Sequence, residues 1–213
     1  MIAIVDYGMG NLRSVENALH FIGCEALITS DIEVINKSQA LILPGVGAFA
    51  RAMHNLKKTG LDNVVIDAIK RKKLFMGICL GLQILFDYSE EGGERVEGLG
   101  VFSGAIKHIP AGKNIKVPHI GWNSLELKNN SDIFNGLNNV PYVYFVHSYF
   151  LDAIDKKMVI ATSTHGIEMD VAIENENTYA FQFHPEKSGD IGLSVLRNFA
   201  KRTNESNKIV GNF

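Results

Sequence analysis

The sequence predicts an α/β protein: an open mixed, mostly parallel sheet flanked by helices, with an antiparallel strand extension in the second half. In residues 1–89, short apolar runs alternate with amphipathic stretches, a pattern typical of the βα units that build parallel sheets. From about Gly98 to Asp152 the helical pattern weakens, and Gly, Asn and Pro separate short strand-like runs. A length of 213 residues, of which 46% are apolar and 21% charged, suits one globular domain.

The first half opens on the apolar run IAIV, which predicts a buried strand closed by the turn YGMGN. Apolar residues then recur at helical spacing from Leu12 to Ile22, and the pattern stops at Gly23. The same two patterns repeat along the chain. They predict strands at 25–28, 40–47 and 74–78 and helices at 48–56, 62–72 and 80–89.

The second half is predicted to contain mainly antiparallel strands, in the runs SLEL, VYFV and MVIAT. YAFQFHPE is predicted to be a late strand, and Leu193, Leu196 and Phe199 supply the apolar positions of a terminal helix. The residues that follow this helix are mostly polar. We therefore expect a single domain over residues 1–201 and a loose polar tail over residues 202–213.

The charge balance argues against several classes of function. The formal net charge is −2, with acidic and basic residues interspersed, which disfavours a nucleic-acid surface and a helix lying on a membrane. No apolar run reaches the roughly 18 residues of a membrane-spanning helix, and the N-terminus lacks the basic region and cleavage site of a signal peptide. Cys24 and Cys79 are the two cysteines, and we expect both to be free thiols in a reducing cytoplasm.

Cys79 lies in the apolar stretch LFMGICLGLQILF, where a strand is expected to end and a helix to begin. The pattern Gly77-Ile78-Cys79-Leu80-Gly81 has the G-x-nucleophile-x-G form of a nucleophile elbow, in which side chains at the two glycine positions would collide. A helix N-terminus after the thiol would stabilise its thiolate, and the Leu80 N–H would be free to bind an oxyanion. Taken alone, the pattern fits a buried structural cysteine equally well.

A thiol nucleophile needs a base and a group that orients the base, and HPE near the C-terminus offers both. Pro185 favours an extended backbone at His184, and side chains two apart in an extended segment point the same way, so Glu186 is expected to face the imidazole. Cys79 and His184 both follow predicted strands, whose carboxyl ends gather at one edge of a parallel sheet. The acid follows the histidine, an order that disfavours an ordinary α/β-hydrolase.

Other chemistries have weaker support in the sequence. YGMGNLR has Gly-x-Gly after the first strand, but Arg13 stands where a dinucleotide-binding loop has its third glycine. A metal hydrolase built on His119, His147 and His184 lacks a ligand spacing such as H-x-x-x-H. We therefore expect no cofactor and no metal. A cysteine hydrolase of similar fold stays open as an alternative, whereas a degenerate, purely binding protein is disfavoured by the complete Cys, His and Glu set.

These residues together resemble the class I glutamine amidotransferase family. GICLGLQ with a distant HPE is shared across that family, and LILPGVGAF resembles its Gly-rich loop. VDYGMGNLRSV, VPHIGWN and YFVHSYF resemble the branch that passes ammonia to a (β/α)8-barrel cyclase subunit in histidine biosynthesis. The resemblance covers residues 1–201 and implies that family's α/β fold, glutamine hydrolysis through a cysteine thioester, a heterodimer with the cyclase, and no cofactor. A glutaminase subunit of another class I amidotransferase is the nearest alternative.

The resemblance also implies roles for individual residues. The implied catalytic residues are Cys79, His184 and Glu186, and the implied oxyanion hole uses backbone N–H groups of Val46, Gly47 and Leu80. The implied glutamine-binding residues are Gly45, Gln83, Glu91, His147, Ser148 and Tyr149. In this assignment Glu91 pairs with the α-ammonium and residues 147–149 bind the α-carboxylate. Without the resemblance, Gln83 and Glu91 would be assigned to a solvated helix face and loop, and the Gly-rich loop to a plain turn.

The cyclase is expected to bind against the loop PHIGWN. The residues expected at this interface are Asn11, His119, Trp122, Asn123 and Lys187. Trp122 is the only tryptophan, and an exposed Trp in a Gly-containing loop suggests an interface anchor, although a Trp that fills the local core fits the sequence as well.

Overall fold

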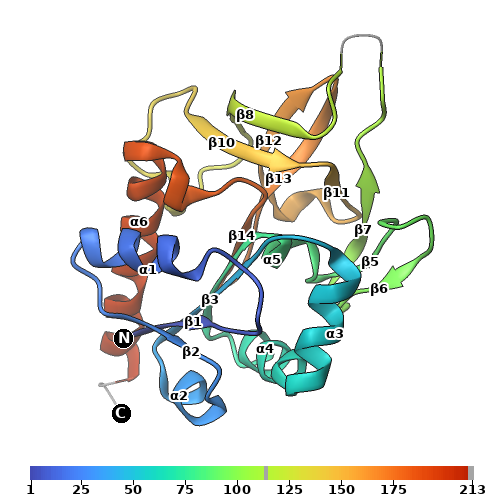
Figure 1. Ribbon diagram of the computed structural model, residues 1–213. Coiled ribbons are helices and arrows are strands. Elements are labelled where there is room, and N and C mark those ends of the chain that lie inside the picture. The colour runs from blue at the N-terminus through green and yellow to red at the C-terminus, as the bar shows by residue number, and fades with distance from the viewer. Residues whose placement is uncertain (113–114, 211–213) are drawn as a thin grey trace.

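The computed structural model describes residues 1–112 and 115–210, with side chains described as far as Thr203 (Figure 1). This part of the chain forms one large mixed sheet, one separate two-stranded sheet and six α-helices. Three short 3-10 helices, at Asp132–Phe134, Lys156–Met158 and Pro185–Lys187, complete the described elements. Helices flank the large sheet, as the alternating pattern of the first half predicts.

One half of the large sheet is parallel and contains four strands from the first half of the chain. In spatial order it consists of β2 (Ala26–Thr29), β1 (Ile2–Val5), β3 (Ala40–Gly45), β4 (Leu74–Cys79) and β14 (Thr178–Phe181). Every neighbouring pair in this half is parallel. All of these strands except β2 are buried along their whole length, as expected for strands covered on both faces. The segments that follow β3, β4 and β14 therefore meet at one edge of the sheet.

The other half is mostly antiparallel, as the sequence pattern predicts. It continues through β13 (Ile167–Asn175), β11 (Tyr149–Ala153), β7 (Phe102–His108), β5 (Phe86–Ser89) and β6 (Val96–Glu97), and β12 (Val159–His165) and β9 (Glu126–Leu127) extend it beside β13. In this half of the described sheet, β5 and β7 are the one parallel pair. The separate sheet is an antiparallel ribbon of β8 (His119–Ser124) and β10 (Tyr142–His147).

Helices cover both faces of the parallel half and enclose two cores. One face carries α1 (Leu12–Phe21) and α6 (Gly189–Val210), and the other carries α2 (Ile32–Lys37), α3 (Phe49–Thr59) and α4 (Leu61–Lys70) (Figure 1). Successive strand residues alternate between the two cores because of the pleat. Thus Ile4 packs in the core under α1 and α6, whereas Val5 packs in the core under α3 and α4.

The prediction of a helix over residues 80–89 is wrong. α5 (Leu80–Gln83) is a single turn, after which the chain enters β5. Residues 80–86 are all buried, and a fully buried apolar run has no periodicity that distinguishes a helix from a strand. Contacts with a later segment of the chain favour the strand, because the N–H of Leu99 donates to the carbonyl oxygen of Ile84.

The C-terminal helix is longer than the apolar pattern indicates. α6 runs to Val210, so the predicted boundary between domain and tail at residue 201 lies inside this helix. Residues 211–213 of the predicted tail lie outside the described residues. None of the helices in the described part of the chain combines the length and apolar character needed to cross a lipid bilayer.

Close backbone contacts hold the turn between β4 and α5. A Cβ on Gly81 would overlap the carbonyl oxygen of Leu43 in β3, and a Cβ on Gly77 would lie 2.7 Å from the carbonyl oxygen of Gly81. A Cβ on Gly45 would lie 2.8 Å from the Cβ of Leu80. The steric role predicted for Gly77 and Gly81 is thus confirmed, because these glycines let backbone segments touch with no side chain between them.

Gly81→Ala is expected to destabilise the protein strongly. The new methyl group must displace the backbone of β3, which should lower the free energy of unfolding by about 3 kcal/mol. Gly92→Ala is the matched control, since its Cβ would meet no atom within 4 Å and only the left-handed φ of +89° opposes it, at a cost of about 1 kcal/mol. Urea unfolding of both variants measures the difference, and equal losses would contradict the proposed contact.

Candidate active site

Cys79 occupies a strained backbone position at the end of β4. Its φ is +55° and its ψ is −110°, in a region that non-glycine residues rarely adopt. The pairing of Cys79 with Gly45 and the glycine contacts behind α5 hold this conformation. The residue is 7% exposed, and its side chain lines a cavity of about 340 Å³. Backbone strain that the surrounding structure enforces is typical of functional sites.

His184 and Glu186 form a buried pair beyond the end of β14. His184 has an extended backbone, as predicted before a proline, and its N–H donates to the carbonyl oxygen of Tyr144. Its Nδ1 lies 2.8 Å from Oε1 of Glu186, and both side chains are at most 2% exposed. The contact forms through the 3-10 turn Pro185–Lys187 rather than along an extended strand, so the expected pairing is present by a different local geometry.

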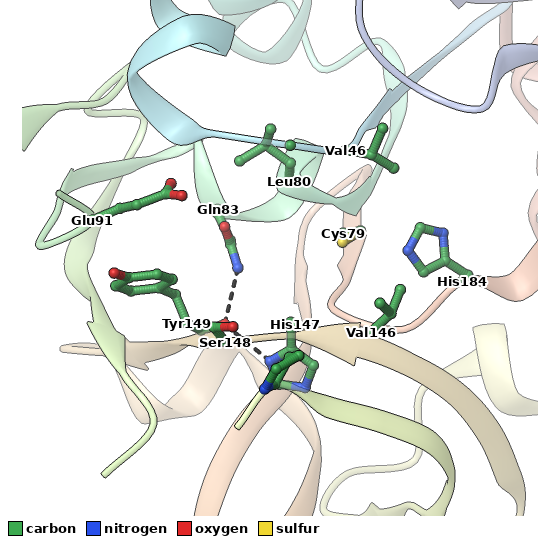
Figure 2. Close-up of a pocket in the computed structure, with 12 residues that line it drawn as sticks. Val46, Cys79, Leu80, Gln83, Glu91, Val146, His147, Ser148, Tyr149 and His184 are labelled. Carbon is green, nitrogen blue, oxygen red and sulfur yellow. Dashed lines mark hydrogen bonds between the residues drawn. The ribbon is translucent and has the colours of Figure 1, made fainter. Parts of the chain in front are cut away.

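The imidazole of His184 lies beside the sulfur of Cys79 (Figure 2). Burial lowers the pKa of His184, but its interactions with Cys79 and then Glu186 outweigh burial and raise this pKa to about 10. Nε2 is buried and has no hydrogen-bond partner among the described residues, which leaves it free to exchange a proton with the sulfur or with a ligand. The arrangement favours a protonated His184, which places an acid beside the candidate nucleophile.

The residues expected to bind an oxyanion line the same cavity as the sulfur. Val46, Gly47 and Leu80 all line the cavity. The Leu80 N–H is the first of α5, so no carbonyl of that helix can accept from it. Gly45 is different: it ends β3, does not line the cavity, and approaches Tyr7 and Leu80 behind it. The structure therefore places Gly45 where it supports the loop.

The residues expected to hold the two ends of glutamine lie at opposite ends of the cavity lining. Its lining consists of Val46, Gly47, Cys79, Leu80, Gln83, Glu91, Pro118, Val146, His147, Ser148, Tyr149 and His184. Figure 2 shows Glu91 and Tyr149 at one end and Cys79 and His184 at the other. An amino acid with a carboxamide side chain matches this arrangement, because its ammonium group and its amide lie at opposite ends.

Gln83 and Glu91 each make contacts that limit what they can offer a ligand. The amide nitrogen of Gln83 donates to the carbonyl oxygen of Tyr149 at 3.0 Å and to Oε1 of Gln182 at 2.9 Å, which uses both of its hydrogens. Its own oxygen remains for a ligand. Glu91 follows β5, and its Oε2 accepts from the N–H of Phe49 at 2.6 Å, at the start of α3. Its carboxylate therefore joins the cavity to the helix after the Gly-rich loop.

His147 and His119 form a buried neutral pair beneath the cavity. Nδ1 of His147 lies 2.9 Å from the carbonyl oxygen of Tyr149, so Nδ1 carries the hydrogen and Nε2 accepts from Nδ1 of His119 at 3.0 Å. The amide nitrogen of Asn123 lies 3.3 Å from Nε2 of His119. Burial lowers the pKa of His147 to about 3 and that of His119 to about 4. Both ring nitrogens of His147 are thus engaged within the protein.

The residues expected at the partner interface divide between surface and core. Trp122 is 55% exposed and Ile120 is 61% exposed, so the outward side of β8 is apolar. His119 is 4% exposed because side chains alternate along the strand, and its imidazole is therefore buried beneath the ribbon. Asn11 is half-buried, Lys187 is exposed, and the half-buried Asn123 donates to the carbonyl oxygen of Thr164.

Sequence reasoning missed one buried polar residue at this site. Gln182 is 0% exposed, and its amide nitrogen lies 3.6 Å from the sulfur of Cys79. Gln182 is the one polar residue in the run AFQF, and it lies two residues before His184, as Glu186 lies two residues after it. The same spacing argument that placed Glu186 beside His184 could therefore have pointed to Gln182. Pro118 and Val146 also line the cavity without having been singled out. Within the described residues, no group of three or more His, Cys, Asp and Glu side chains is placed to hold a metal ion.

Comparison with known proteins places this geometry in a family. Residues 3–203 match the family model described as "Glutamine amidotransferase class-I". The chain is 49% identical over 201 residues to imidazole glycerol phosphate synthase subunit HisH of Caldanaerobacter subterraneus subsp. tengcongensis, covering 94% of this chain and 98% of that protein. It is 46% identical over 200 residues to the subunit of the same name from Aquifex aeolicus, covering 93% and 95%.

Solved structures show the same fold. A crystal structure of a glutamine amidotransferase superposes with a TM-score of 0.74 at 21% identity, covering 96% of this chain and 100% of that one. The structure of PurLQS from Thermotoga maritima superposes with a TM-score of 0.71 at 21% identity, covering 94% of this chain and 97% of the matched one. The predicted fold class is confirmed.

The buried histidine pair is expected to make the protein sensitive to acid. An unfolded chain binds a proton at each imidazole below about pH 6.5, whereas the folded chain keeps His147 and His119 neutral down to about pH 4. The stability that each histidine contributes is full above pH 6.5 and falls as the pH is lowered toward 4, by on the order of 2 kcal/mol per histidine between pH 7 and pH 5.

Urea unfolding at several pH values measures this dependence. His147→Gln is expected to flatten the slope of unfolding free energy against pH, and the exposed His54→Gln serves as control and should leave it unchanged. A slope in His147→Gln as steep as in the natural chain would contradict the assignment.

Proposed function

Because this chain belongs to the class I glutamine amidotransferase family, and within it to the HisH subunits of imidazole glycerol phosphate synthase, we propose that it hydrolyses glutamine to glutamate and ammonia for a cyclase subunit. The observation that carries this proposal is the meeting of Cys79 and His184 at one end of a single cavity, with Glu186 hydrogen-bonded to His184. The cyclase subunit, HisF, uses the ammonia to form imidazole glycerol phosphate and an aminoimidazole carboxamide ribotide in histidine biosynthesis.

The reaction begins with attack by the Cys79 thiolate on the side-chain amide carbon of glutamine. The carbonyl oxygen becomes an oxyanion that accepts hydrogen bonds from the Leu80 N–H and from the Val46–Gly47 loop. One such donor lowers the activation barrier by about 3 kcal/mol in enzymes that use an oxyanion hole, so the position of the loop strongly affects the rate. His184 gives its proton to the departing ammonia, and a thioester remains on the sulfur.

Hydrolysis of the thioester reverses the proton movements. Neutral His184 removes a proton from a water molecule, and the resulting hydroxide adds to the thioester carbon. The second tetrahedral intermediate expels the thiolate and releases glutamate. Glu186 accepts from Nδ1 of His184 throughout, which fixes the tautomer and supports the imidazolium that forms at two stages.

The far end of the cavity supports recognition of the amino-acid group. Glu91 is placed to pair with the α-ammonium, and residues 147–149 form the wall where the α-carboxylate would lie. Glu91 also accepts from the N–H of Phe49, three residues after Val46. Binding of the ammonium is therefore linked through one carboxylate to the loop that we assign to the oxyanion hole.

The apolar outward side of β8 supports the proposed heterodimer. Trp122 contacts the ring of Tyr144 edge-on, and with Ile120 it forms an exposed apolar surface on the ribbon. The same ribbon supplies His147, at the end of β10, to the cavity. A cyclase bound on this surface would lie close to the site where ammonia is released.

Cys79→Ala is expected to abolish glutamine-dependent product formation by the complex, by about a thousand-fold or more, because no thioester can form. Cyclase activity with added ammonium salts should survive, since ammonia then enters without the glutaminase. Both activities are assayed in the complex with the cyclase. Cys24→Ala, which removes the other free thiol, is the control and should keep both. Loss of both activities in a folded Cys79→Ala complex would contradict ammonia delivery.

Trp122→Ala is expected to weaken the complex with the cyclase by about ten-fold or more, as for an aromatic side chain near the centre of an interface. Calorimetric titration of one protein with the other measures the dissociation constant. Phe21 in α1 is 75% exposed, and Phe21→Ala is a matched control that should leave the affinity unchanged. An unaltered dissociation constant for Trp122→Ala would place the interface elsewhere.

A further inference from the structure

Gln182 presents a hydrogen-bond donor to the nucleophile from inside the protein. Its side chain is 0% exposed, and its Nε2 lies 3.6 Å from Sγ of Cys79. It follows directly after β14, which pairs in parallel with β4, so two neighbouring strands carry the amide and the sulfur. Gln182 does not line the cavity. Its contact with the sulfur therefore comes from behind the site of substrate attack.

The orientation of the Gln182 amide follows from its partners. A backbone carbonyl can only accept, so the carbonyl oxygen of Tyr149 fixes which end of the Gln83 amide is nitrogen. That nitrogen also donates to Oε1 of Gln182, which leaves Nε2 of Gln182 directed to the sulfur. The Tyr149 carbonyl is held in turn by Nδ1 of His147. A run of buried hydrogen bonds thus aims one N–H at Cys79.

We propose that Gln182 is a thiolate-binding residue, whose amide N–H stabilises and positions the Sγ anion of Cys79 in the resting enzyme and again when the thioester is hydrolysed. An N–H bonds a charged sulfur more strongly than a neutral thioester sulfur. The bond therefore weakens when the thioester forms, and it strengthens when water has added and the carbon–sulfur bond breaks with the electron pair returning to sulfur. Gln182 thereby assists departure of the thiolate.

The catalytic part of this inference rests on the proposed glutaminase function, whereas the state of the sulfur can be measured without glutamine. The test uses Gln182→Met, which keeps the length of the side chain and removes the donor. Alkylation of Cys79 by iodoacetamide is followed against pH in the complex with the cyclase, with mass spectrometry to identify the modified cysteine. Turnover of glutamine is measured in parallel.

The expected result is a rise of about one unit in the pH at which alkylation reaches half its maximal rate, as for loss of one hydrogen bond to an anion. The kcat for glutamine should fall by about ten-fold or more, and KM should stay within about two-fold, because Gln182 does not touch the substrate. An unchanged alkylation profile with normal kcat would overturn the inference. A shifted alkylation profile in a protein without glutaminase activity would instead overturn the proposed function alone.

A matched control separates this role from packing. Asn198 in α6 donates to the carbonyl oxygens of Ile133 and Asn135, none of these residues lines the cavity, and Asn198→Leu removes an amide in the same way. Asn198→Leu should lower the melting temperature without moving the alkylation profile. A shift in this control as large as in Gln182→Met would show that general loosening, and not the donor, controls the sulfur.

A measurement on the natural sequence keeps the test decisive if Gln182→Met does not fold. The side-chain amide protons of Gln182 are observed by NMR in the 15N-labelled chain within the complex, before and after alkylation of Cys79. Loss of the N–H bond to the thiolate should move one amide proton to lower frequency, with a smaller change at Gln83. Identical resonances before and after alkylation would overturn the inference.

Discussion

The active site depends on the direct backbone contact between β3, the end of β4 and α5. At this crossing Gly81 lies against the Leu43 carbonyl and Gly45 lies against Leu80, with no room for a Cβ on either glycine. The contact is what allows Cys79 to keep a φ of +55°, since a strained residue persists only where its surroundings leave no relaxed alternative. The same contact brings the Gly-rich loop after β3 to the side of the sulfur, so the nucleophile and the proposed oxyanion hole share one support.

Buried polar atoms without partners occur at this crossing and in the His184–Glu186 pair. Among the described residues, four buried side-chain atoms lack a hydrogen bond, and two of them are Nε2 of His184 and Oε2 of Glu186. A third is the hydroxyl of Tyr7, which lies close to Gly45 and whose pKa burial and then Cys79 raise. Orphaned polar groups are costly in a core, so their presence in the His184–Glu186 pair and at Tyr7 indicates that this site lowers the stability of the fold.

Sequence patterns predicted the parallel half of the sheet and the grouping of Cys79, His184 and Glu186, because those features depend on local chemistry. An apolar run between turns specifies a buried strand, and G-x-C-x-G with HPE specifies residue types at fixed spacing. The helix predicted for residues 80–89 failed because the choice between helix and strand there is made by distant backbone, through the bond from Leu99 to Ile84. The burial of His119 and the role of Gln182 were equally hidden, since each follows from the packing of segments far apart in sequence.

The pKa values of two histidines at the site are shifted in opposite directions: that of His184 is raised and that of His147 is lowered. His184 is held charged by Cys79 and Glu186, whereas burial keeps His147 neutral, an effect to which the charge on His184 adds. If His147 gained a proton, its Nε2–H would face the Nδ1–H of His119, and the bond between them would be lost. The neutral state preserves the Tyr149 carbonyl, the Gln83 amide and the Gln182 amide in one orientation. An uncharged, hydrogen-bonded polar layer therefore lies beside the charged His184, and its hydrogen bonds do not titrate near neutral pH.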